Sequence, residues 1–117
     1  MKKNKRFCLA LDLINDHNLI SEYIEYHKNI WPEIKKSLLD SGIEKAEIYH
    51  TDDRLFMILD VNNSFSLSKK KKMDNNNPIV NEWENLMWKY QKSLPSAKKG
   101  EKWVLMKKVF DLNNNNE

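Results

Sequence analysis

The residue that stands out chemically is His27, which lies in the middle of an otherwise apolar helix face. Apolar and aromatic residues recur around it at intervals of three and four, the period of one face of a helix: Leu19, Ile20, Tyr23, Ile24, His27, Ile30, Trp31, Ile34 and Leu38. Tyr23 lies one turn before His27 and Trp31 one turn after it, so we expect the three side chains to stack along one line. Because an imidazole exchanges protons near neutral pH, the pattern indicates acid–base chemistry beside aromatic rings.

A histidine in this position also has an ordinary structural explanation. A single His on an apolar helix face is commonly a core residue whose ring nitrogens have partners. Tyr23 and Trp31 are likewise compatible with core aromatics whose polar atoms are satisfied. The helical spacing alone therefore leaves both interpretations open.

Other kinds of chemistry find little support in the sequence. The chain has two glycines, which stand apart, so there is no glycine-rich phosphate loop. No Ser or Cys nucleophile has a neighbouring base in the sequence. His17, His27 and His50 share no ligand spacing, and Cys8 is the single cysteine, so we expect no metal and no cofactor. A pocket with aromatic walls and a few polar groups would suit a small sugar.

The elements that position His27 begin with a strand and a long helix. Residues 7–13 alternate large apolar residues with small or polar ones, as in a strand that packs one face. A polar break at residues 15–18 then leads into the helix of His27. Pro32 removes a backbone donor inside this helix and predicts a kink or a restart there. We expect the helix to end at Gly42.

The rest of the chain predicts a hairpin, two helices and a strand. The hairpin joins residues 46–50 and 54–61 through a short polar connection. The pattern then predicts a short helix over residues 64–73 and a longer one over residues 78–93, which begins with a Pro at its first position. A final apolar strand is predicted over residues 102–110.

This order predicts an α+β fold, the ferredoxin-like β-α-β-β-α-β arrangement with a four-stranded antiparallel sheet. Both helices would cover one face of the sheet. The last two strands carry apolar residues on both sides, so we expect a second copy to cover the other face and form a homodimer, a dimeric α+β barrel. Trp88 points away from the core stripe of its helix, which indicates a dimer contact or a pocket wall. Residues 1–112 form one domain in this interpretation, and residues 113–117 form a disordered Asn-rich tail.

Composition limits the other function classes. The chain has 117 residues, of which 40% are hydrophobic and 32% charged, with a net charge of +3. These values are typical of one globular domain with a modest core. The lysines at residues 69–72 are not interleaved with aromatics, so we expect no nucleic-acid partner. No apolar run is long enough for a membrane span or a signal peptide, and the expected location is the cytoplasm.

Several short motifs resemble one known family. Tyr23-x-x-x-His27 is followed by Ile-Trp-Pro-Glu-Ile at residues 30–34, Ile-Tyr at residues 48–49 and Leu-Phe at residues 55–56. Together they resemble the L-rhamnose mutarotase family of dimeric ferredoxin-like proteins, in register from about Arg6 to Phe110. The resemblance implies interconversion of the α and β anomers of an aldohexose without cofactor or metal. It also implies that His27 is the catalytic proton donor and that Tyr23 contacts the sugar.

Two positions depart from the family pattern. Ala46 stands where well-studied bacterial members have a substrate-contacting Tyr, and Trp83-Glu84 stands where they have a Trp pair. The resemblance thus implies Trp83 as a substrate-binding residue, with Glu84 matching in position but not in type. Trp31 belongs to the motif as a wall of the site. The expected substrate is a 6-deoxy sugar, L-rhamnose by family resemblance, with L-fucose as the alternative.

The predicted mechanism is general acid–base ring opening and closure. His27 would protonate the ring oxygen, and the second group would be Tyr23, Glu84 or a water. Two other functions stay open on a similar fold. One is a cofactor-free monooxygenase or haem-degrading enzyme, which also uses a His or aromatic pocket between helix and sheet. The other is a non-catalytic ligand-binding module in which His27 is merely buried.

Overall fold

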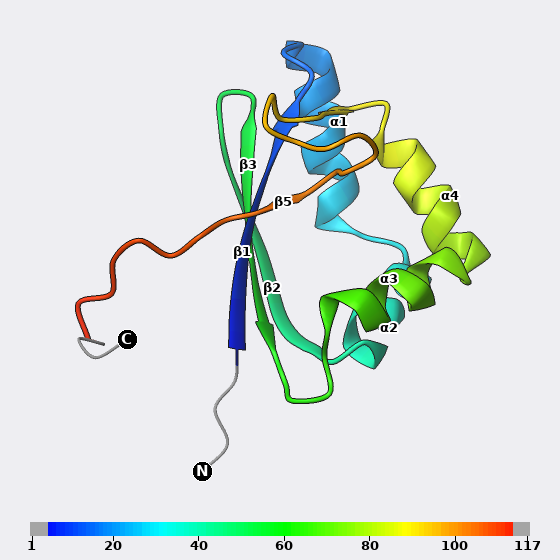
Figure 1. Ribbon diagram of the computed structural model, residues 1–117. Helices are drawn as coiled ribbons and strands as arrows, with labels where there is room; N and C mark the ends of the chain where they lie inside the picture. The colour runs from blue at the N-terminus through cyan, green and yellow to red at the C-terminus, as the bar shows by residue number, and fades with distance from the viewer. Residues whose placement is uncertain (1–4, 114–117) are drawn as a thin grey trace.

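The computed structural model describes residues 5–113, which form one antiparallel sheet with helices on one side (Figure 1). The elements in chain order are β1 Lys5–Leu13, α1 His17–Lys28, α2 Pro32–Asp40, β2 Ile43–Thr51, β3 Arg54–Val61, α3 Leu67–Asn75, α4 Pro78–Met87, β4 Gln91–Lys92 and β5 Val104–Leu105. The predicted α+β class is confirmed.

The sheet follows the predicted topology. Its strand order is β2-β3-β1-β4, with β5 pairing with β1 as well, and all pairs are antiparallel. The predicted hairpin is present as β2 and β3, joined at Asp52, whose φ of 49° is positive. The central strand β1 is therefore held on one side by β3 along its whole length and on the other side by two short strands.

The long helix predicted around His27 is two helices. Asp16 caps α1 by accepting a hydrogen bond from the Leu19 N–H at 3.0 Å. The helix ends at Lys28, and α2 begins at Pro32, so the predicted restart is confirmed. The proline has no N–H to donate and sits at the first position of α2, where none is needed. His27 thus lies in the last turn of α1, next to the break.

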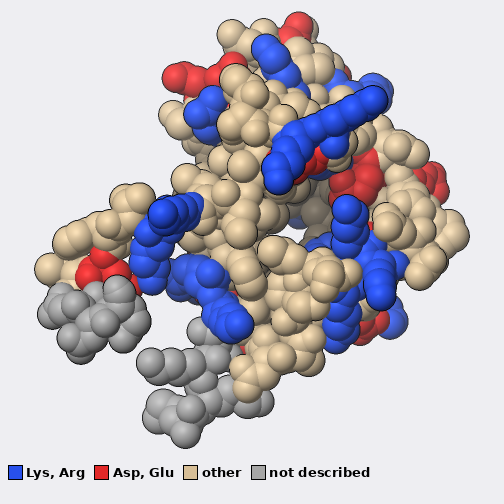
Figure 2. All heavy atoms as spheres, viewed as in Figure 1, with Lys and Arg blue, Asp and Glu red and all other residues tan. Residues whose placement is uncertain are grey.

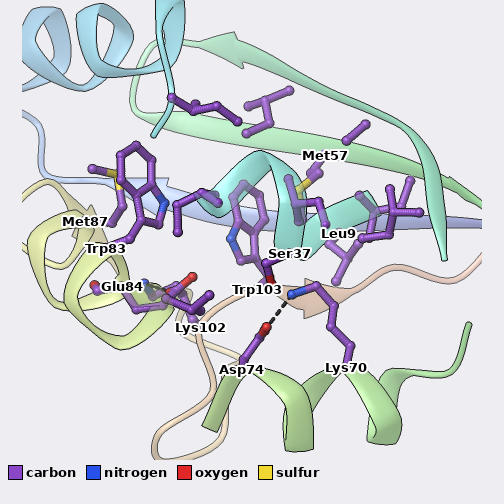
Figure 3. A pocket seen from close by; sticks show the side chains of 18 of the residues that line it. Leu9, Ser37, Met57, Lys70, Asp74, Trp83, Glu84, Met87, Lys102 and Trp103 are labelled. Carbon is purple, nitrogen blue, oxygen red and sulfur yellow. Dashed lines mark hydrogen bonds and ion pairs between the residues drawn. The ribbon is translucent and has the colours of Figure 1, made fainter. Parts of the chain in front are cut away.

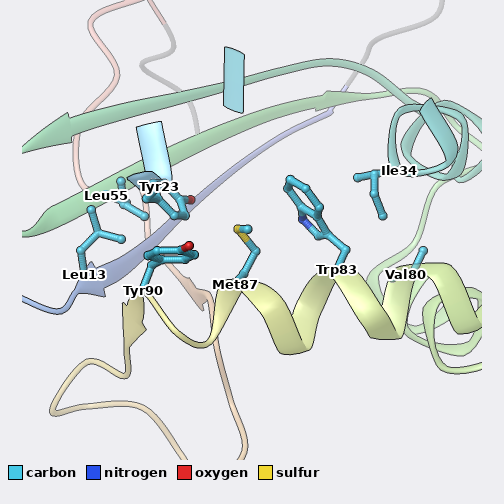
Figure 4. Close-up of a cluster of buried hydrophobic side chains, with 8 residues drawn as sticks. All are labelled: Leu13, Tyr23, Ile34, Leu55, Val80, Trp83, Met87 and Tyr90. Atoms are coloured by element: carbon cyan, nitrogen blue, oxygen red, sulfur yellow. The ribbon is translucent and has the colours of Figure 1, made fainter. Parts of the chain in front are cut away.

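The helices pack on one face of the sheet around two apolar clusters. The larger cluster joins α1, α2 and α4 to the sheet (Figure 4); its buried members are Leu13, Tyr23, Ile34, Leu55, Val80, Trp83, Met87 and Tyr90. The smaller cluster lies at the other end of the sheet and contains Leu9, Ile43, Leu59, Val61 and Phe65. Trp103 packs against both clusters.

The second half of the chain differs from the prediction in both helices and in the strands that follow them. The short helix begins later than expected, because Ser66 rather than Ser64 caps it. The helix predicted over residues 78–93 stops at Met87. The reason is tertiary: the Tyr90 carbonyl accepts a hydrogen bond from the Ile14 N–H at 2.8 Å and Gln91 pairs with Leu13, so the chain must leave the helix to reach the sheet edge. The resulting strand β4 was not predicted.

The final strand is much shorter than residues 102–110. Only Val104–Leu105 form β5, followed by one bond from the Met106 N–H to the Cys8 carbonyl at 2.7 Å. Beyond that point the chain leaves the sheet, and Val109 and Phe110 are 90% and 75% exposed. Residues that favour strands form one only where a neighbouring strand offers an edge to pair with, and the residues after Met106 have no such edge within the described residues. With β4 added, the sheet has five strands rather than four.

Two other predictions concern the ends of the chain and its surface. Apart from Asn113, the predicted disordered tail lies outside the described residues. Lys and Arg side chains lie in several separate places on the face seen in Figure 2, with fewer acidic ones among them, and do not form one basic stripe. Within residues 5–113, no helix has the length and apolar content to cross a membrane.

The face of the sheet away from the helices is open. The register places Cys8 opposite Ile58 and Ala10 opposite Phe56 on this side. Bidentate ion pairs flank this apolar centre. Asp12 accepts from Arg54 at 2.6 and 3.2 Å, and Asp60 accepts from Arg6 at 2.8 and 3.4 Å. An apolar centre with a charged rim is the usual composition of a protein contact surface.

Candidate active site

A cavity of about 660 Å³ lies between the sheet and the helices. Its walls come from α1, α2, α3, α4, the three long strands and the segment before β5 (Figure 3). Four of the five residues predicted for the site line it: Tyr23, His27, Trp83 and Glu84. These residues are as far apart as 61 positions in the sequence, and the fold brings them to one place.

His27 is held in one tautomer by its own helix. Its Nδ1 lies 2.9 Å from the carbonyl oxygen of Tyr23. A carbonyl only accepts hydrogen bonds, so Nδ1 carries the proton and Nε2 of the neutral ring carries the free lone pair. Burial lowers the pKa of His27, with the bond to Tyr23 acting in the opposite sense. The imidazole is therefore ready to accept a proton at neutral pH.

Tyr23 presents a buried hydroxyl next to this imidazole. The two ring centroids are 4.3 Å apart, and Tyr23 is only 2% exposed. Its Oη makes no hydrogen bond of good geometry among the described residues, although the Gln91 side chain lies near enough to lower its pKa somewhat. Burial raises the pKa of Tyr23 to about 12, so the hydroxyl stays protonated at any physiological pH. A buried donor without a partner beside a cavity is a candidate contact for a ligand oxygen.

Trp83 forms the aromatic wall, and Trp31 supports it from behind. The Trp83 ring meets His27 edge-on at 5.6 Å and Trp31 edge-on at 5.0 Å between centroids. Trp31 packs against the core cluster but is not part of the cavity lining. A direct sugar contact by Trp31 stays a prediction, and its position favours a supporting role.

Glu84 reaches the cavity as half of an ion pair. Its carboxylate and its backbone carbonyl both accept hydrogen bonds from Lys102 Nζ. The same ammonium lies 4.7 Å from the ring centroid of Trp88. Trp88 thus supports Lys102 but is not part of the cavity lining, so the pocket-wall alternative predicted for it is not met and the dimer contact stays a prediction. The Lys102 side chain is 12% exposed and that of Glu84 46% exposed.

Two polar residues at this end of the cavity were not predicted from the sequence. Gln91 is buried in β4, and its Oε1 has no hydrogen-bond partner within the described part of the chain. Lys102 precedes β5. Gln91 was assigned to a helix and Lys102 to the start of a strand, so neither was expected beside His27. Ala46 also lines the cavity, and its small side chain leaves space on the wall formed by β2.

These groups suit proton transfer on a neutral polyol. One imidazole accepts a proton, a phenol donates a hydrogen bond, a carboxamide oxygen accepts one, and an indole offers a flat apolar surface. Within residues 5–113 no three His, Cys, Asp or Glu side chains come together to hold a metal ion.

A sequence model described as "L-rhamnose mutarotase" matches residues 6–112. The chain belongs to the L-rhamnose mutarotase family. Members of this family are carbohydrate isomerases of the racemase and epimerase class, and the predicted enzyme class is confirmed.

Individual relatives agree with this placement. The chain is 38% identical over 110 residues to the L-fucose mutarotase of Xanthomonas campestris pv. campestris, and the match covers 92% of this chain and 88% of that relative. It is 39% identical over 112 residues to a UPF0734 protein of Dictyostelium discoideum, covering 92% and 90%. Among solved structures, the L-rhamnose mutarotase of Formosa agariphila has the same fold, with a TM-score of 0.69, 23% identity, and coverage of 92% of this chain and 98% of that one.

Proposed function

We propose that the protein interconverts the α and β anomers of a 6-deoxy-L-hexose and that His27 transfers the proton. The observation that carries this proposal is the orientation of His27. The Nδ1 bond to the Tyr23 carbonyl leaves Nε2 as the free base at a cavity that also contains an unpartnered hydroxyl and an indole wall.

The tautomer favours His27 as a base in the first step. Nε2 removes the proton from the anomeric hydroxyl, the electron pair of that O–H bond forms the C1 carbonyl, and the bond from C1 to the ring oxygen breaks. The ring oxygen takes up a proton, which the newly formed imidazolium can supply, because both oxygens are attached to C1. This differs from the sequence prediction, in which His27 acts first as an acid.

The open-chain aldehyde then rotates about the bond from C1 to C2. The hydroxyl that was the ring oxygen attacks the other face of the carbonyl, and the same proton transfers run in reverse. Tyr23 donates a hydrogen bond to a sugar oxygen throughout, since a group whose pKa is about 12 does not act as a base at neutral pH. General acid–base help of this kind typically contributes about 10²–10⁴-fold, enough for a reaction that already proceeds in water.

The substrate is either L-rhamnose or L-fucose in this proposal. The family supports L-rhamnose, and the 38% identical relative named L-fucose mutarotase supports L-fucose. The two sugars differ in configuration at C2 and C4. Trp83 offers a surface for the C–H groups of a pyranose, while Glu84 and Lys102 offer an acceptor and a donor for its hydroxyls.

Anomer exchange measured by NMR saturation transfer tests the activity. We expect micromolar protein to accelerate exchange of L-rhamnose, L-fucose or both above the rate in buffer, with D-glucose as the comparison sugar. Exchange of all three sugars at the buffer rate would show that the protein is not an aldose mutarotase.

We also propose that two copies pair through the open face of the sheet. The apolar centre of that face and the exposed side chains of Val109, Phe110 and Leu112 support this, since a single chain leaves them in water. Light scattering should give twice the 14.0 kDa of one chain. Phe110→Lys should weaken the dimer and Leu39→Lys, on the helix side, should not; a wild-type monomer at micromolar concentration would contradict the proposal.

The cytoplasm is the location that we propose. Cys8 is a free, partly buried thiol, which suits a reducing compartment. Fractionation of cells that express the tagged protein tests this, and recovery in a secreted fraction would contradict it.

A further inference from the structure

The cavity extends well beyond the residues that the mutarotase reaction needs. A volume of about 660 Å³ is within the range of about 300–1,000 Å³ that holds ligands of drug size, and a single pyranose ring is smaller than these. Tyr23, His27, Trp83 and Gln91 line one end. The lining continues along the sheet to α3, where Lys70 and Asp74 face the space.

The α3 end has polar groups of its own. Lys70 Nζ donates to Asp74 Oδ2 at 2.5 Å, and the two side chains are only 23% and 25% exposed. The second carboxylate oxygen, Asp74 Oδ1, is buried and has no hydrogen-bond partner in the described part of the chain. A buried carboxylate oxygen that has no partner beside a cavity is a candidate acceptor for a ligand hydroxyl.

A second indole lines the cavity near the Lys70–Asp74 pair. Trp103 is partly buried, lines the cavity and packs against both apolar clusters. Figure 3 shows it between Lys102 and Lys70, with Ser37 close by. Each end of the cavity thus has a tryptophan and a lysine–carboxylate pair: Trp83 with Lys102–Glu84 at the His27 end, and Trp103 with Lys70–Asp74 at the α3 end.

We propose that the α3 end is a second saccharide subsite, so that the cavity takes a disaccharide with its reducing ring at His27. This inference rests on the proposed mutarotase function. The second ring would lie against Trp103 and give its hydroxyls to Asp74 and Lys70. Since C1 of the reducing ring faces His27, the second ring is attached at O3 or O4, on the far side of that ring from C1.

The charges favour a neutral saccharide over a phosphorylated or acidic one. Lys70 and Lys102 each have a carboxylate partner, so each pair is neutral and offers one donor and one acceptor. A hydroxyl both donates and accepts, and it matches such a pair. A phosphate would have to compete with Asp74 and Glu84 for the two ammonium groups.

The test compares exchange of a free 6-deoxy-L-hexose with that of its disaccharides. The probes are L-fucose and L-rhamnose, each alone and with a galactosyl ring on O3 or on O4, and the measured quantity is kcat/KM for anomer exchange of the reducing ring. We expect at least one disaccharide to exchange with a kcat/KM no lower than that of its monosaccharide. Asp74→Asn and Lys70→Met should each lower the disaccharide value by about tenfold or more, the loss of one hydrogen bond to a charged group, and leave the monosaccharide value unchanged.

A matched control removes a similar pair outside the cavity. Lys36 and Asp40 on α2 form an exposed pair with the same four-residue spacing, at 2.6 Å. Asp40→Asn should change neither substrate. Exchange of the monosaccharides but of no disaccharide would overturn the subsite and leave the mutarotase function intact. A disaccharide rate that survives Asp74→Asn and Lys70→Met would overturn the subsite as well, whereas exchange of neither kind of sugar would overturn the mutarotase function itself.

Discussion

Replacing Tyr23 by Phe separates a ligand-binding hydroxyl from a structural one. The Oη of this 2% exposed side chain has no partner among the described residues. Leaving a buried hydroxyl unpaired costs about 1–3 kcal/mol, and the neighbouring Gln91 side chain reduces that cost. We therefore expect Tyr23→Phe to have the same free energy of unfolding as the wild type or one higher by up to about 1 kcal/mol, equivalent to a Tm higher by up to about 4 °C.

The same substitution should weaken sugar binding without slowing the chemistry. A hydrogen bond between neutral groups contributes about 0.5–1.5 kcal/mol, so KM should rise about two- to twelvefold. The maximum rate should stay near that of the wild type, because a phenol whose pKa is about 12 is not the base.

Two assays measure these effects. Thermal unfolding followed by circular dichroism gives the stability, and saturation-transfer NMR over a range of sugar concentrations gives KM and kcat. Tyr49→Phe is the matched control, since its hydroxyl is on an exposed side chain, lies outside the cavity and donates to Glu47 at 3.3 Å. A Tyr23→Phe protein that loses more than about 1 kcal/mol of stability and keeps its KM would refute the reasoning, because the hydroxyl would then have a structural partner.

Three further predictions concern pH, the ion pair and the fold. Burial lowers the pKa of His27 below its ordinary value of 6.5, so kcat should be constant near neutrality and should fall with decreasing pH only below 6.5. Because the unfolded chain binds this proton more tightly than the folded one, the free energy of unfolding should also fall as the pH decreases from 6.5. A rate that rises on acidification would contradict the role of His27 as a base. Glu84→Gln should lower kcat/KM for anomer exchange about tenfold, because it removes the charge that faces Lys102. The Glu84 side chain is half-exposed, so the loss in free energy of unfolding should be limited to about 1 kcal/mol. Unchanged kinetics for both deoxy sugars would exclude Glu84 from the site. Gly42→Ala should lower the free energy of unfolding, measured by urea denaturation, by about 2 kcal/mol or more, since φ is +103° and a Cβ would lie 2.7 Å from a side-chain oxygen. Gly100 has a φ of +82° and open space around it, so Gly100→Ala should cost about 1 kcal/mol. Equal losses would show that the contact at Gly42 does not matter.

Local patterns in the sequence were sufficient for the first half of the fold. The alternation in β1, the break before Pro32 and the hairpin of β2 and β3 depend on residues close together in the chain, and each was predicted. The His27 face was also predicted, because helical periodicity already places Tyr23 and His27 one turn apart.

Features that depend on distant partners were not predicted. The helical period continues past Met87, but pairing with Leu13 draws Gln91 into a strand. The apolar residues up to Phe110 favour a strand, but β1 supplies an edge for only two of them. Gln91 and Lys102 come to the site through these same two segments, so the errors in the fold and the missing site residues have one cause.

The most direct test of the account is the anomer exchange rate of His27→Ala. The wild type should accelerate exchange of L-rhamnose or L-fucose, and the variant should lose about 10²–10⁴-fold of the catalysed rate, down to the rate in buffer. Its circular dichroism spectrum and thermal unfolding should stay those of a folded protein, so that the loss belongs to the imidazole. A folded His27→Ala protein that exchanges anomers as fast as the wild type would contradict the central claim that His27 transfers the proton.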